Sequence, residues 1–290
     1  MKFDKNTKIL IVGLGLIGGS YAKALSDEGY FVGAIDKKKS SVEYALKNGL
    51  IRVGETSVKK DFVKDFDLIV FALYPHDFIN WIKEYQSSIK SGALITDVTG
   101  VKSFVVENVQ KILRGDLEFV GAHPMAGKEV SGVENADSKI FVGANYIVTP
   151  TKKNTDENVQ AVKDLGRALG FDRISSLSPE EHDETVGFLS HLTHCIAVSL
   201  MVSKKSHHLA EYTGDSFRDL TRIAKINDEM WSELFLENKD ELLKQMDLFE
   251  EKFNQLKEDI KNDNREKIRE TLRESTARRK VFDKDAKETK

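Results

Sequence analysis

Residues 8–25 of the 290-residue chain read KILIVGLGLIGGSYAKAL, and this stretch decides the fold. Residues 9–12 are continuously apolar, which is typical of a strand buried on both faces of a parallel sheet. Glycines follow, and residues 21–25 then place apolar side chains at helical spacing. The stretch therefore predicts a strand, a tight turn and a helix in succession.

The same alternation of apolar runs and helical patterns continues to about residue 178. Further strands are expected at residues 31–36, 67–73, 93–98, 117–123, 144–150 and 172–178. Helical patterns at residues 40–49 and 156–170 separate some of these strands. Strands that alternate with helices predict the α/β class, with a doubly wound, mostly parallel sheet.

From Pro179 onward the pattern predicts helices alone. Residues 179–202 begin with acidic side chains, which favour a helix N-terminus, and then turn apolar on most faces, so we expect a buried helix. An apolar stripe on a later charged helix comprises Leu242, Leu243, Met246, Phe249, Phe253, Leu256 and Ile260. A small domain cannot readily cover such a stripe by itself, so we expect a homodimer. The two domains are expected at residues 1–178 and 179–290.

The composition argues against several classes of function. The chain is 40% apolar and has a net charge of −3 with both signs interspersed, so no nucleic-acid surface is expected. The first apolar stretch is far too short to span a bilayer, so we expect no membrane association. Cys195 is the only cysteine, so no internal disulfide can form. These features predict a reduced, cytoplasmic protein.

The glycines of residues 13–18 form the pattern G-x-G-x-x-G between the first predicted strand and helix. Such glycines permit a tight turn and the close approach of a pyrophosphate, which the helix N-terminus binds through free N–H groups. Asp36 ends the second strand about 20 residues further on, where a carboxylate can accept hydrogen bonds from a ribose 2′-hydroxyl. The residues expected at this dinucleotide site are Gly13, Gly15, Leu16, Ile17, Gly18 and Asp36. Asp36 favours NAD, and the lysines at 37–39 leave NADP as the weaker alternative.

Three segments follow strands at the sheet edge where ligands bind in open parallel sheets: ALYPHD (72–77), DVTGVK (97–102) and AHPMAG (122–127). His123 ends its strand there, close to the expected nicotinamide, and its imidazole can take a hydroxyl proton while hydride leaves the adjacent carbon. The neighbouring glycines let main chain approach both ligands. The histidines interpreted as surface or packing residues are His76, His182, His207 and His208.

A polar cluster lies on the predicted helix at SHLTH, where Ser190, His191 and His194 share one face. These side chains are either satisfied polar groups of the core or part of a site. The H-x-x-H pair lacks a third and fourth ligand for zinc, so no metal is expected. Arg218 and Arg222 follow at a spacing of four, and Asp219 is available to pair with one of them. Either could form a surface ion pair, whereas a free guanidinium could bind a carboxylate through two hydrogen bonds.

The chain closely resembles the prephenate/arogenate dehydrogenase family of tyrosine biosynthesis in several motifs, taken in order: GLGLIGGS, Asp36, DVTGVK, GAHPMAGKEVSG, SHLTH and FRDLTRIA, with Trp231 nine residues after Arg222. The resemblance extends from about Lys8 to the 230s. It implies an N-terminal Rossmann domain and a C-terminal all-helical dimerisation domain. It also implies NAD(P)-dependent oxidative decarboxylation of prephenate to 4-hydroxyphenylpyruvate, with release of CO2.

The resemblance also implies roles for individual residues. His123 is similar to the family's catalytic histidine, which hydrogen-bonds the ring 4-hydroxyl and assists the loss of hydride from C4. Ser190 and His194 resemble substrate-site residues of the helical domain, and we expect Ser190 to take part in catalysis. Arg222 resembles the arginine that holds a substrate carboxylate, and Trp231 resembles the aromatic residue near the pocket.

One position departs from the family pattern. Gly100 in DVTGVK stands where the family often has serine, whose hydroxyl helps to orient the catalytic histidine and the substrate. We expect the adjacent hydroxyl of Thr99 to take this catalytic role, unless its side chain points into the sheet.

Three alternatives stay open. Arogenate dehydrogenase acts on a substrate with an amino group in place of the keto oxygen, and no residue here decides between the two substrates. A β-hydroxyacid dehydrogenase would have a lysine-based catalytic helix in place of SHLTH. A non-catalytic NAD-binding sensor could dispense with the polar cleft residues, whereas His123, Ser190, His194 and Arg222 are all present.

Overall fold

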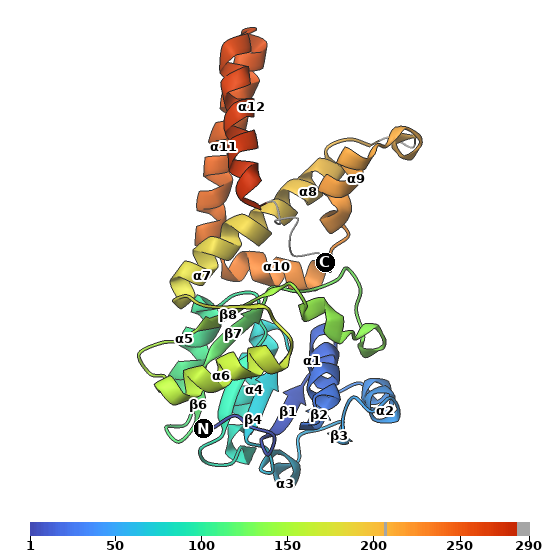
Figure 1. The fold of residues 1–290 in the computed structure, drawn as a ribbon, viewed down its shortest axis with the longest axis vertical. Coiled ribbons are helices and arrows are strands. Elements are labelled where there is room, and N and C mark those ends of the chain that lie inside the picture. Colours follow the sequence, from blue (N-terminus) through green and yellow to red (C-terminus); the bar gives the residue numbers. More distant parts are fainter. Residues whose placement is uncertain (206–207, 283–290) are drawn as a thin grey trace. The chain divides into compact units, whose positions relative to one another are not determined.

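The computed structural model describes residues 1–205 and 208–282, so His207 lies outside the described residues. The chain divides into two compact units, residues 1–239 and residues 240–290. The first unit holds both β-sheets and the helices that cover them, together with α7 to α10 (Figure 1). Through residue 282, the second unit consists of helices and their connecting turns.

The main sheet of the first unit has six strands in the order β3-β2-β1-β4-β5-β6, and all of its pairings are parallel. Its strands are β1 (Lys8–Val12), β2 (Phe31–Ile35), β3 (Val53–Glu55), β4 (Leu68–Phe71), β5 (Leu94–Asp97) and β6 (Glu118–Phe119). Its helices are α1 (Leu16–Asp27), α2 (Lys39–Lys47), α3 (Lys60–Val63), α4 (Pro75–Tyr85) and α5 (Ser103–Ile112). The strand order reverses between β1 and β4, so the prediction of a doubly wound α/β sheet is confirmed.

A second, three-stranded sheet has the order β7-β8-β9. Its strands are β7 (Gly121–Pro124), β8 (Asn145–Thr149) and β9 (Arg173–Ser176), and α6 (Asp156–Ala168) connects the last two. The β7–β8 pairing is antiparallel, whereas β8 and β9 are parallel.

The expectation of one continuous strand at 117–123 is therefore wrong, because these residues belong to two sheets. Val120 N–H still donates to the carbonyl of Ile95 in the main sheet, and Gly121 then begins β7. A Cβ at Gly121 would lie 2.5 Å from the hydroxyl of Thr149 on β8, so only glycine lets the two strands approach here.

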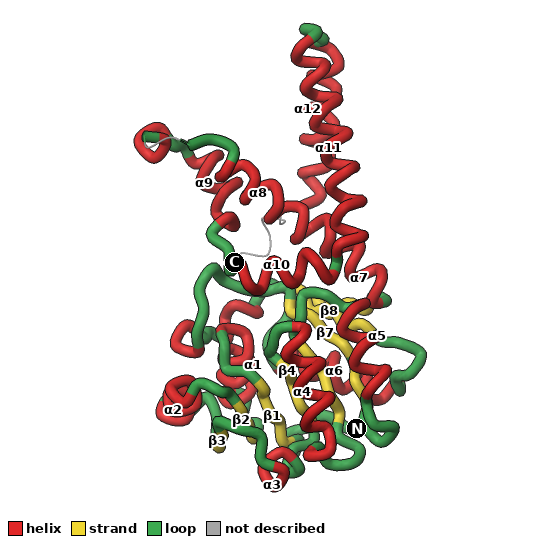
Figure 2. The backbone as a smooth tube through the Cα atoms, turned by 180° about the vertical axis from the view of Figure 1, so that it is seen from behind, coloured by secondary structure: helices red, strands yellow, loops and turns green. Residues whose placement is uncertain are grey.

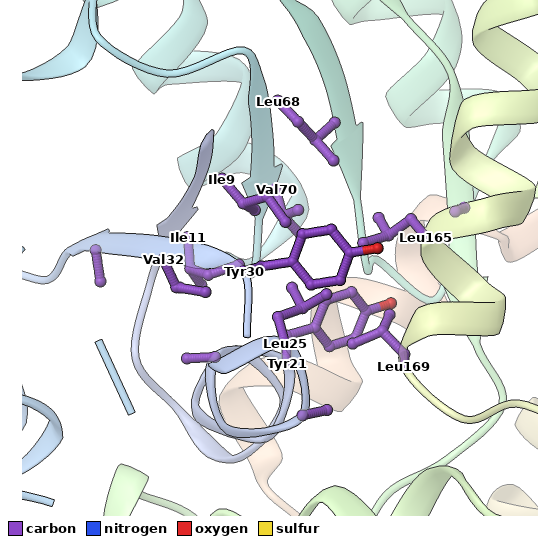
Figure 3. Packing of buried hydrophobic residues seen from close by; sticks show 14 of the residues in the cluster. Ile9, Ile11, Tyr21, Leu25, Tyr30, Val32, Leu68, Val70, Leu165 and Leu169 are labelled. Carbon is purple, nitrogen blue, oxygen red and sulfur yellow. The ribbon is translucent and has the colours of Figure 1, made fainter. Parts of the chain in front are cut away.

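Both faces of the main sheet are buried, which explains the unbroken apolar runs of its strands. Ile9 and Ile11 of β1 pack with α1 and α6 on one face, where Tyr21 and Leu165 join them (Figure 3). The alternate residues of β1 enter the cluster on the other face, together with α4 and α5. Each face therefore has its own core.

Helices follow from Pro179, as the pattern predicted. Within the first unit they are α7 (Pro179–Val186), the π-helical turn η4 (Gly187–Leu192), α8 (Thr193–Val202), α9 (Asp215–Thr221) and α10 (Asp228–Glu237), with short 3-10 turns at Leu209–Tyr212 and Arg222–Ala224. A capping box between Ser178 and Glu181 starts α7.

The helical run 179–202 is far less buried than the sequence led us to expect. Of α8, only Ala197 is buried, and Val202 is 74% exposed. By length and composition alone, residues 179–202 could also cross a membrane. The expectation of a buried helix is wrong for the single chain. Apolar side chains on most faces of a helix indicate that protein covers it, but they do not indicate whether that protein is the same chain or a second one.

The second unit is a helical hairpin of α11 (Lys239–Lys261) and α12 (Arg265–Arg279), as Figure 2 shows. Asp263 has a positive φ in the connecting turn, where Asn264 N–H bonds to the carbonyl of Asp259. Several members of the predicted apolar stripe on α11 are exposed: Leu243, Met246, Phe249, Phe253 and Ile260.

A buried ion pair fixes the loop after β5 to the second sheet. Lys102 and Asp97 are both fully buried, and the ammonium lies 2.6 Å from Asp97 Oδ2. The other carboxylate oxygen of Asp97 accepts a hydrogen bond from Ala122 N–H of β7 at 3.0 Å. Asp97 therefore holds the end of β5, the following loop and the start of β7 in one place.

We predict that Lys102→Met lowers the free energy of unfolding by about 3–5 kcal/mol, because it leaves the Asp97 carboxylate buried without its cation. Urea unfolding of the variant and the wild type measures the difference. Lys23→Met is the matched control, since Lys23 forms an exposed pair with Asp27 worth at most about 1 kcal/mol. A loss in Lys102→Met no larger than that of the control would contradict the assignment.

Candidate functional site

The glycine-rich turn between β1 and α1 has the geometry that a dinucleotide requires. Gly13 has a φ of +98°, and a Cβ there would lie 2.4 Å from the carbonyl oxygen of Ala72. A Cβ at Gly18 would lie 1.9 Å from the carbonyl oxygen of Gly13, so α1 could not pack against the turn. Nothing lies within 4 Å of a Cβ at Gly15, which leaves room for a pyrophosphate. Leu16 and Ile17 begin α1, which has no side-chain cap, so its first N–H groups are available to phosphates.

Asp36 follows the end of β2 and contacts the same turn. Its Oδ2 accepts a hydrogen bond from Leu14 N–H at 2.6 Å, and its Oδ1 accepts one from Lys38 N–H at 2.7 Å. The carboxylate therefore lies beside the glycine-rich turn, where a ribose hydroxyl of a bound dinucleotide would reach it.

His123 lies at the same edge of the sheet as this turn. Val12, Phe71 and Asp97 are register partners on β1, β4 and β5, so the ends of these strands form one row. Two strand spacings separate Val12 from Asp97, a distance of about 10 Å. Ala122, which bonds to Asp97, precedes His123 directly. His123 therefore lies beside the row of strand ends that the glycine-rich turn adjoins.

The imidazole of His123 is held by a second histidine. Its Nδ1 lies 2.8 Å from Nε2 of His182, and Nδ1 of His182 lies 2.8 Å from Oδ1 of Asp183. The carboxylate of Asp183 also accepts hydrogen bonds from the backbone N–H groups of Lys102 and Ser103, each at 2.8 Å. His182 and Asp183 are buried, so this chain of contacts is shielded from water.

The other ring nitrogen of His123 faces position 100. A Cβ at Gly100 would lie 3.8 Å from His123 Nε2 and 3.4 Å from two methyl carbons of Leu234. Gly100 therefore places no side chain between Nε2 and Leu234, and Nε2 makes no hydrogen bond among the residues that the structure describes.

The expectation that Thr99 orients His123 finds no contact to support it. The Thr99 hydroxyl lies within hydrogen-bonding distance of Asp97 Oδ2 and of the Val101 carbonyl, and it can donate its single hydrogen to one of them at a time. It accepts from Lys102 Nζ at 2.9 Å. Within the described residues it makes no hydrogen bond to His123. Thr99 completes the buried pair of Asp97 and Lys102, and it is position 100 that faces the imidazole.

Helix α10 lies across this end of the sheets in Figures 1 and 2. Asn227, which caps it, donates a side-chain hydrogen bond to the hydroxyl of Tyr74 after β4, and Glu237 lies 2.8 Å from His76 Nε2. Leu234 and Trp231 are three residues apart on α10, so one face carries both. Leu234 meets Gly100, and Trp231 meets the SHLTH segment.

The histidines of SHLTH gather around Trp231. The ring of His194 stacks on Trp231 with centroids 3.7 Å apart, and the buried ring of His191 meets it edge-on at 6.0 Å. His194 Nδ1 donates to the carbonyl of Ser190 at 2.8 Å, whereas the Ser190 hydroxyl has no hydrogen bond among the residues that the structure describes. Ser190, His194 and Trp231 are thus brought together, as expected.

Arg222 forms an ion pair with Glu129, which belongs to the GKEVSG segment after His123. The short turn that begins at Arg222 packs against α8, which carries His194. Burial lowers the pKa of His194, and among the nearby charges Glu129 raises this pKa and Arg222 lowers it. Arg218 instead pairs with Asp215 at 3.3 Å, and Asp219 is not its partner. Arg222 is therefore the arginine that faces the histidine cluster.

The imidazoles of the cluster are neutral near pH 7. Burial lowers the pKa of His123 well below its usual 6.5, and the nearby His182, Lys102 and His191 lower it further. Burial also lowers the pKa of His191 to about 4. A neutral imidazole can accept a proton from a hydroxyl group, which a charged one cannot.

The described part of the chain holds no group of three or more His, Cys, Asp or Glu side chains that could bind a metal ion.

Sequence reasoning missed His182 and Asp183, since it interpreted His182 as a surface or packing residue. The adjacent His-Asp pair, able to hydrogen-bond within one turn, is the one local signal of their role. Their contact with His123 spans 59 residues and becomes visible only in the fold.

Comparisons with known proteins agree with this geometry. Residues 21–172 match the family model described as prephenate dehydrogenase, nucleotide-binding domain, and residues 178–274 match that of the prephenate dehydrogenase dimerization domain. The expectation of an NAD-binding domain is thereby confirmed.

Individual relatives agree as well. The chain is 35% identical over 249 residues to prephenate dehydrogenase of Bacillus subtilis, which covers 82% of this chain and 66% of that protein. It is 32% identical over 257 residues to prephenate dehydrogenase of Lactococcus lactis, with coverages of 86% and 70%. The crystal structure of prephenate dehydrogenase from A. aeolicus, in complex with hydroxyphenyl propionate and NAD+, aligns with a TM-score of 0.87 and 35% identity over 96% of this chain and 98% of that one. The resemblance drawn from the motifs is confirmed, and the chain belongs to the prephenate dehydrogenase family.

Proposed function

We propose that the protein catalyses the NAD-dependent oxidative decarboxylation of prephenate to 4-hydroxyphenylpyruvate and CO2. The observation that carries this proposal is His123, a neutral imidazole at the edge where the glycine-rich turn ends. Its Nδ1 is held by His182, and its Nε2 has no hydrogen-bond partner among the described residues. The complex of the A. aeolicus relative with NAD+ and a hydroxyphenyl acid supports a phenolic product and this cofactor.

The proposed reaction needs a proton acceptor and groups that align the substrate. Nε2 of His123 accepts the proton of the 4-hydroxyl as the C4 hydrogen leaves with its electron pair. The bond from the ring to its carboxylate then breaks, CO2 departs, and the electrons of that bond complete the aromatic ring. His123 returns the proton to the ring oxygen, so protons and charge balance. Bound NAD supplies the hydride acceptor, held by the glycine-rich turn and Asp36.

The substrate carries two carboxylates and a ring, and the cluster offers a matching group for each. Arg222 can exchange its ion pair with Glu129 for a substrate carboxylate, which a guanidinium binds through two hydrogen bonds. We propose that Trp231 and His194 form the wall beside the ring, and that the unpaired hydroxyl of Ser190 contacts the substrate during catalysis. Thr99 has no part in this proposal, because its hydroxyl is bonded within the Asp97 and Lys102 cluster.

We further propose a homodimeric, cytoplasmic protein with a domain boundary between residues 178 and 179. The two family matches, which end at 172 and begin at 178, support this boundary. Dimerisation is supported by the description of the second match and by the exposed Phe188, Met201 and Val202. The buried polar side chains of His182 and Asp183 lie in the same helical run, which argues for a helix covered by protein and against a membrane span.

We predict that His123→Asn lowers kcat by about 10²–10⁴-fold, because the substrate hydroxyl loses its proton acceptor. NADH absorbance measures the rate with prephenate, and titration with NAD measures cofactor affinity, which should stay within a few-fold of wild type. The control is His76→Asn at an exposed histidine of α4. A kcat of His123→Asn within a few-fold of wild type would remove the proposed role.

The wild-type protein also tests the choice of substrate. Equal or faster turnover of arogenate would assign the alternative substrate, and no turnover of either substrate would favour the non-catalytic NAD-binding sensor.

We predict that Arg222→Ala raises the KM for prephenate by about 10–100-fold, the loss expected when a charge-assisted hydrogen bond to a carboxylate is removed. Affinity for NAD should not change, because the glycine-rich turn and Asp36 are the groups proposed to hold NAD, whereas Arg222 pairs with Glu129. Arg218→Ala is the matched control, since Arg218 is exposed and pairs with Asp215. A parallel loss of NAD affinity, or an equal rise of KM in the control, would count against the proposed contact between Arg222 and a substrate carboxylate.

We predict that light scattering gives a mass of twice the 32.7 kDa chain, because a second copy covers the exposed apolar side chains of the helical run. Met201→Glu introduces a charge into that surface and should shift the protein toward the monomer. Lys152→Glu, at an exposed position of the loop before α6, is the control for added negative charge. A monomeric wild type would refute the dimer.

A further inference from the structure

A chain of hydrogen bonds runs from the start of α5 to the imidazole of His123. The backbone N–H groups of Lys102 and Ser103 donate to the two carboxylate oxygens of Asp183 at 2.8 Å each. Asp183 Oδ1 also contacts His182 Nδ1 at 2.8 Å, and His182 Nε2 contacts His123 Nδ1 at 2.8 Å. The chain thus begins at rigid backbone donors and ends at the base of the proposed reaction.

The directions of these hydrogen bonds follow from the first acceptor. An ionised carboxylate can only accept hydrogen bonds. Nδ1 of His182 must therefore carry a hydrogen, which it donates in a hydrogen bond to Asp183. A neutral His182 then has a lone pair on Nε2, which must accept a hydrogen bond from the N–H at Nδ1 of His123. Nδ1 of His123 therefore carries its hydrogen, and Nε2 is left with the lone pair.

The surroundings keep the members of this chain in the required charge states. Burial lowers the pKa of His182, an effect that the charge of Lys102 adds to and that the contact with Asp183 opposes. Burial raises the pKa of Asp183, but hydrogen bonds from His182 and Ser103 outweigh it, and the net shift is downward. A neutral imidazole and an ionised carboxylate are the states that the directions above require.

No other described side chain hydrogen-bonds His123. The groups that face it are His182 of α7, Lys102 before α5 and His191 of η4. Lys102 is engaged by Asp97 and Thr99, and the ring of His191 contacts the side chain of Asn238 at 3.2 Å. Gly100 has no side chain to offer. The orientation of His123 therefore depends on His182.

We propose that Asp183 and His182 are positioning residues that fix His123 as the tautomer with its proton on Nδ1, so that Nε2 is the proton acceptor. The catalytic consequence rests on the proposed function, whereas the tautomer is a property of the free protein. The proposal therefore has one readout that requires no substrate.

The first test combines nitrogen NMR of ¹⁵N-histidine-labelled protein with kinetics. His123→Asn assigns the signals, and in the wild type at neutral pH we expect a protonated Nδ1 and an unprotonated Nε2. Asp183→Asn can donate from its amide to His182 Nδ1, which reverses the chain and moves the proton of His123 to Nε2. We expect kcat to fall by about 10²–10⁴-fold, with KM and NAD affinity within a few-fold of wild type. Asp116→Asn, at an exposed carboxylate paired with Arg114, is the matched control.

Asp183→Asn could fail to fold, because Asp183 also binds the backbone at the start of α5. A second pair of variants therefore tests the proposal at His182. His182→Gln places an amide oxygen where it can accept from His123 Nδ1, so we expect kcat within about 10-fold of wild type. His182→Leu offers no acceptor and should lose about 10²–10⁴-fold. A merely structural role of His182 would affect both variants alike.

Three results would overturn the proposal: a proton on Nε2 of His123 in the wild type, an unchanged tautomer in folded Asp183→Asn, or equal rates in His182→Gln and His182→Leu. The expected tautomer in a wild type that does not turn over prephenate would leave the hydrogen-bond chain intact and remove the proposed function. An active wild type with the opposite tautomer would remove the positioning role alone.

Discussion

The carboxylate of Asp97 is the group on which the rest of the structure depends. It ends β5 in the buried centre of the sheet, where a lone charge is strongly destabilising. Its two oxygens are taken by the ammonium of Lys102 and by Ala122 N–H, so the loop after β5 and the first residues of β7 are fixed to one point. His123 follows Ala122, and α5 follows Lys102. One buried pair therefore sets the positions of both the imidazole and the backbone donors that bind Asp183.

The site combines two electrostatic environments that suit different parts of one anionic substrate. Deep in the cluster, burial keeps the imidazoles of His123 and His191 neutral, which prepares a proton acceptor at neutral pH. At the exposed rim, the guanidinium of Arg222 pairs with the carboxylate of Glu129. In the proposed reaction, a substrate carboxylate replaces Glu129 at the rim while the ring hydroxyl meets the neutral imidazole further in. The separation follows from the burial of the imidazoles, and the neighbouring charges add to it.

Much of this organisation could be read from the sequence, because it depends on local pattern. Three features are each determined by neighbouring residues in the sequence: the apolar run of β1, the glycines at 13, 15 and 18, and the change to helices at Pro179. The break at Val120 could not be read, since it depends on the close approach of Gly121 to Thr149. His182 escaped for the same reason, because its partner lies 59 residues away. The role expected of Thr99 rested on its position next to Gly100 in the sequence. In the structure its hydroxyl bonds within the Asp97 and Lys102 cluster, and position 100 is the one that faces His123.

The central claim is that Nε2 of His123 receives the proton of the ring hydroxyl. A crystal structure of the protein with NAD and a phenolic substrate analogue tests it most directly. The account predicts a separation of about 2.6–3.2 Å between Nε2 and the ring hydroxyl, with Nδ1 still bonded to His182. A ring hydroxyl bound to any other side chain, with His123 beyond hydrogen-bonding distance, would contradict it.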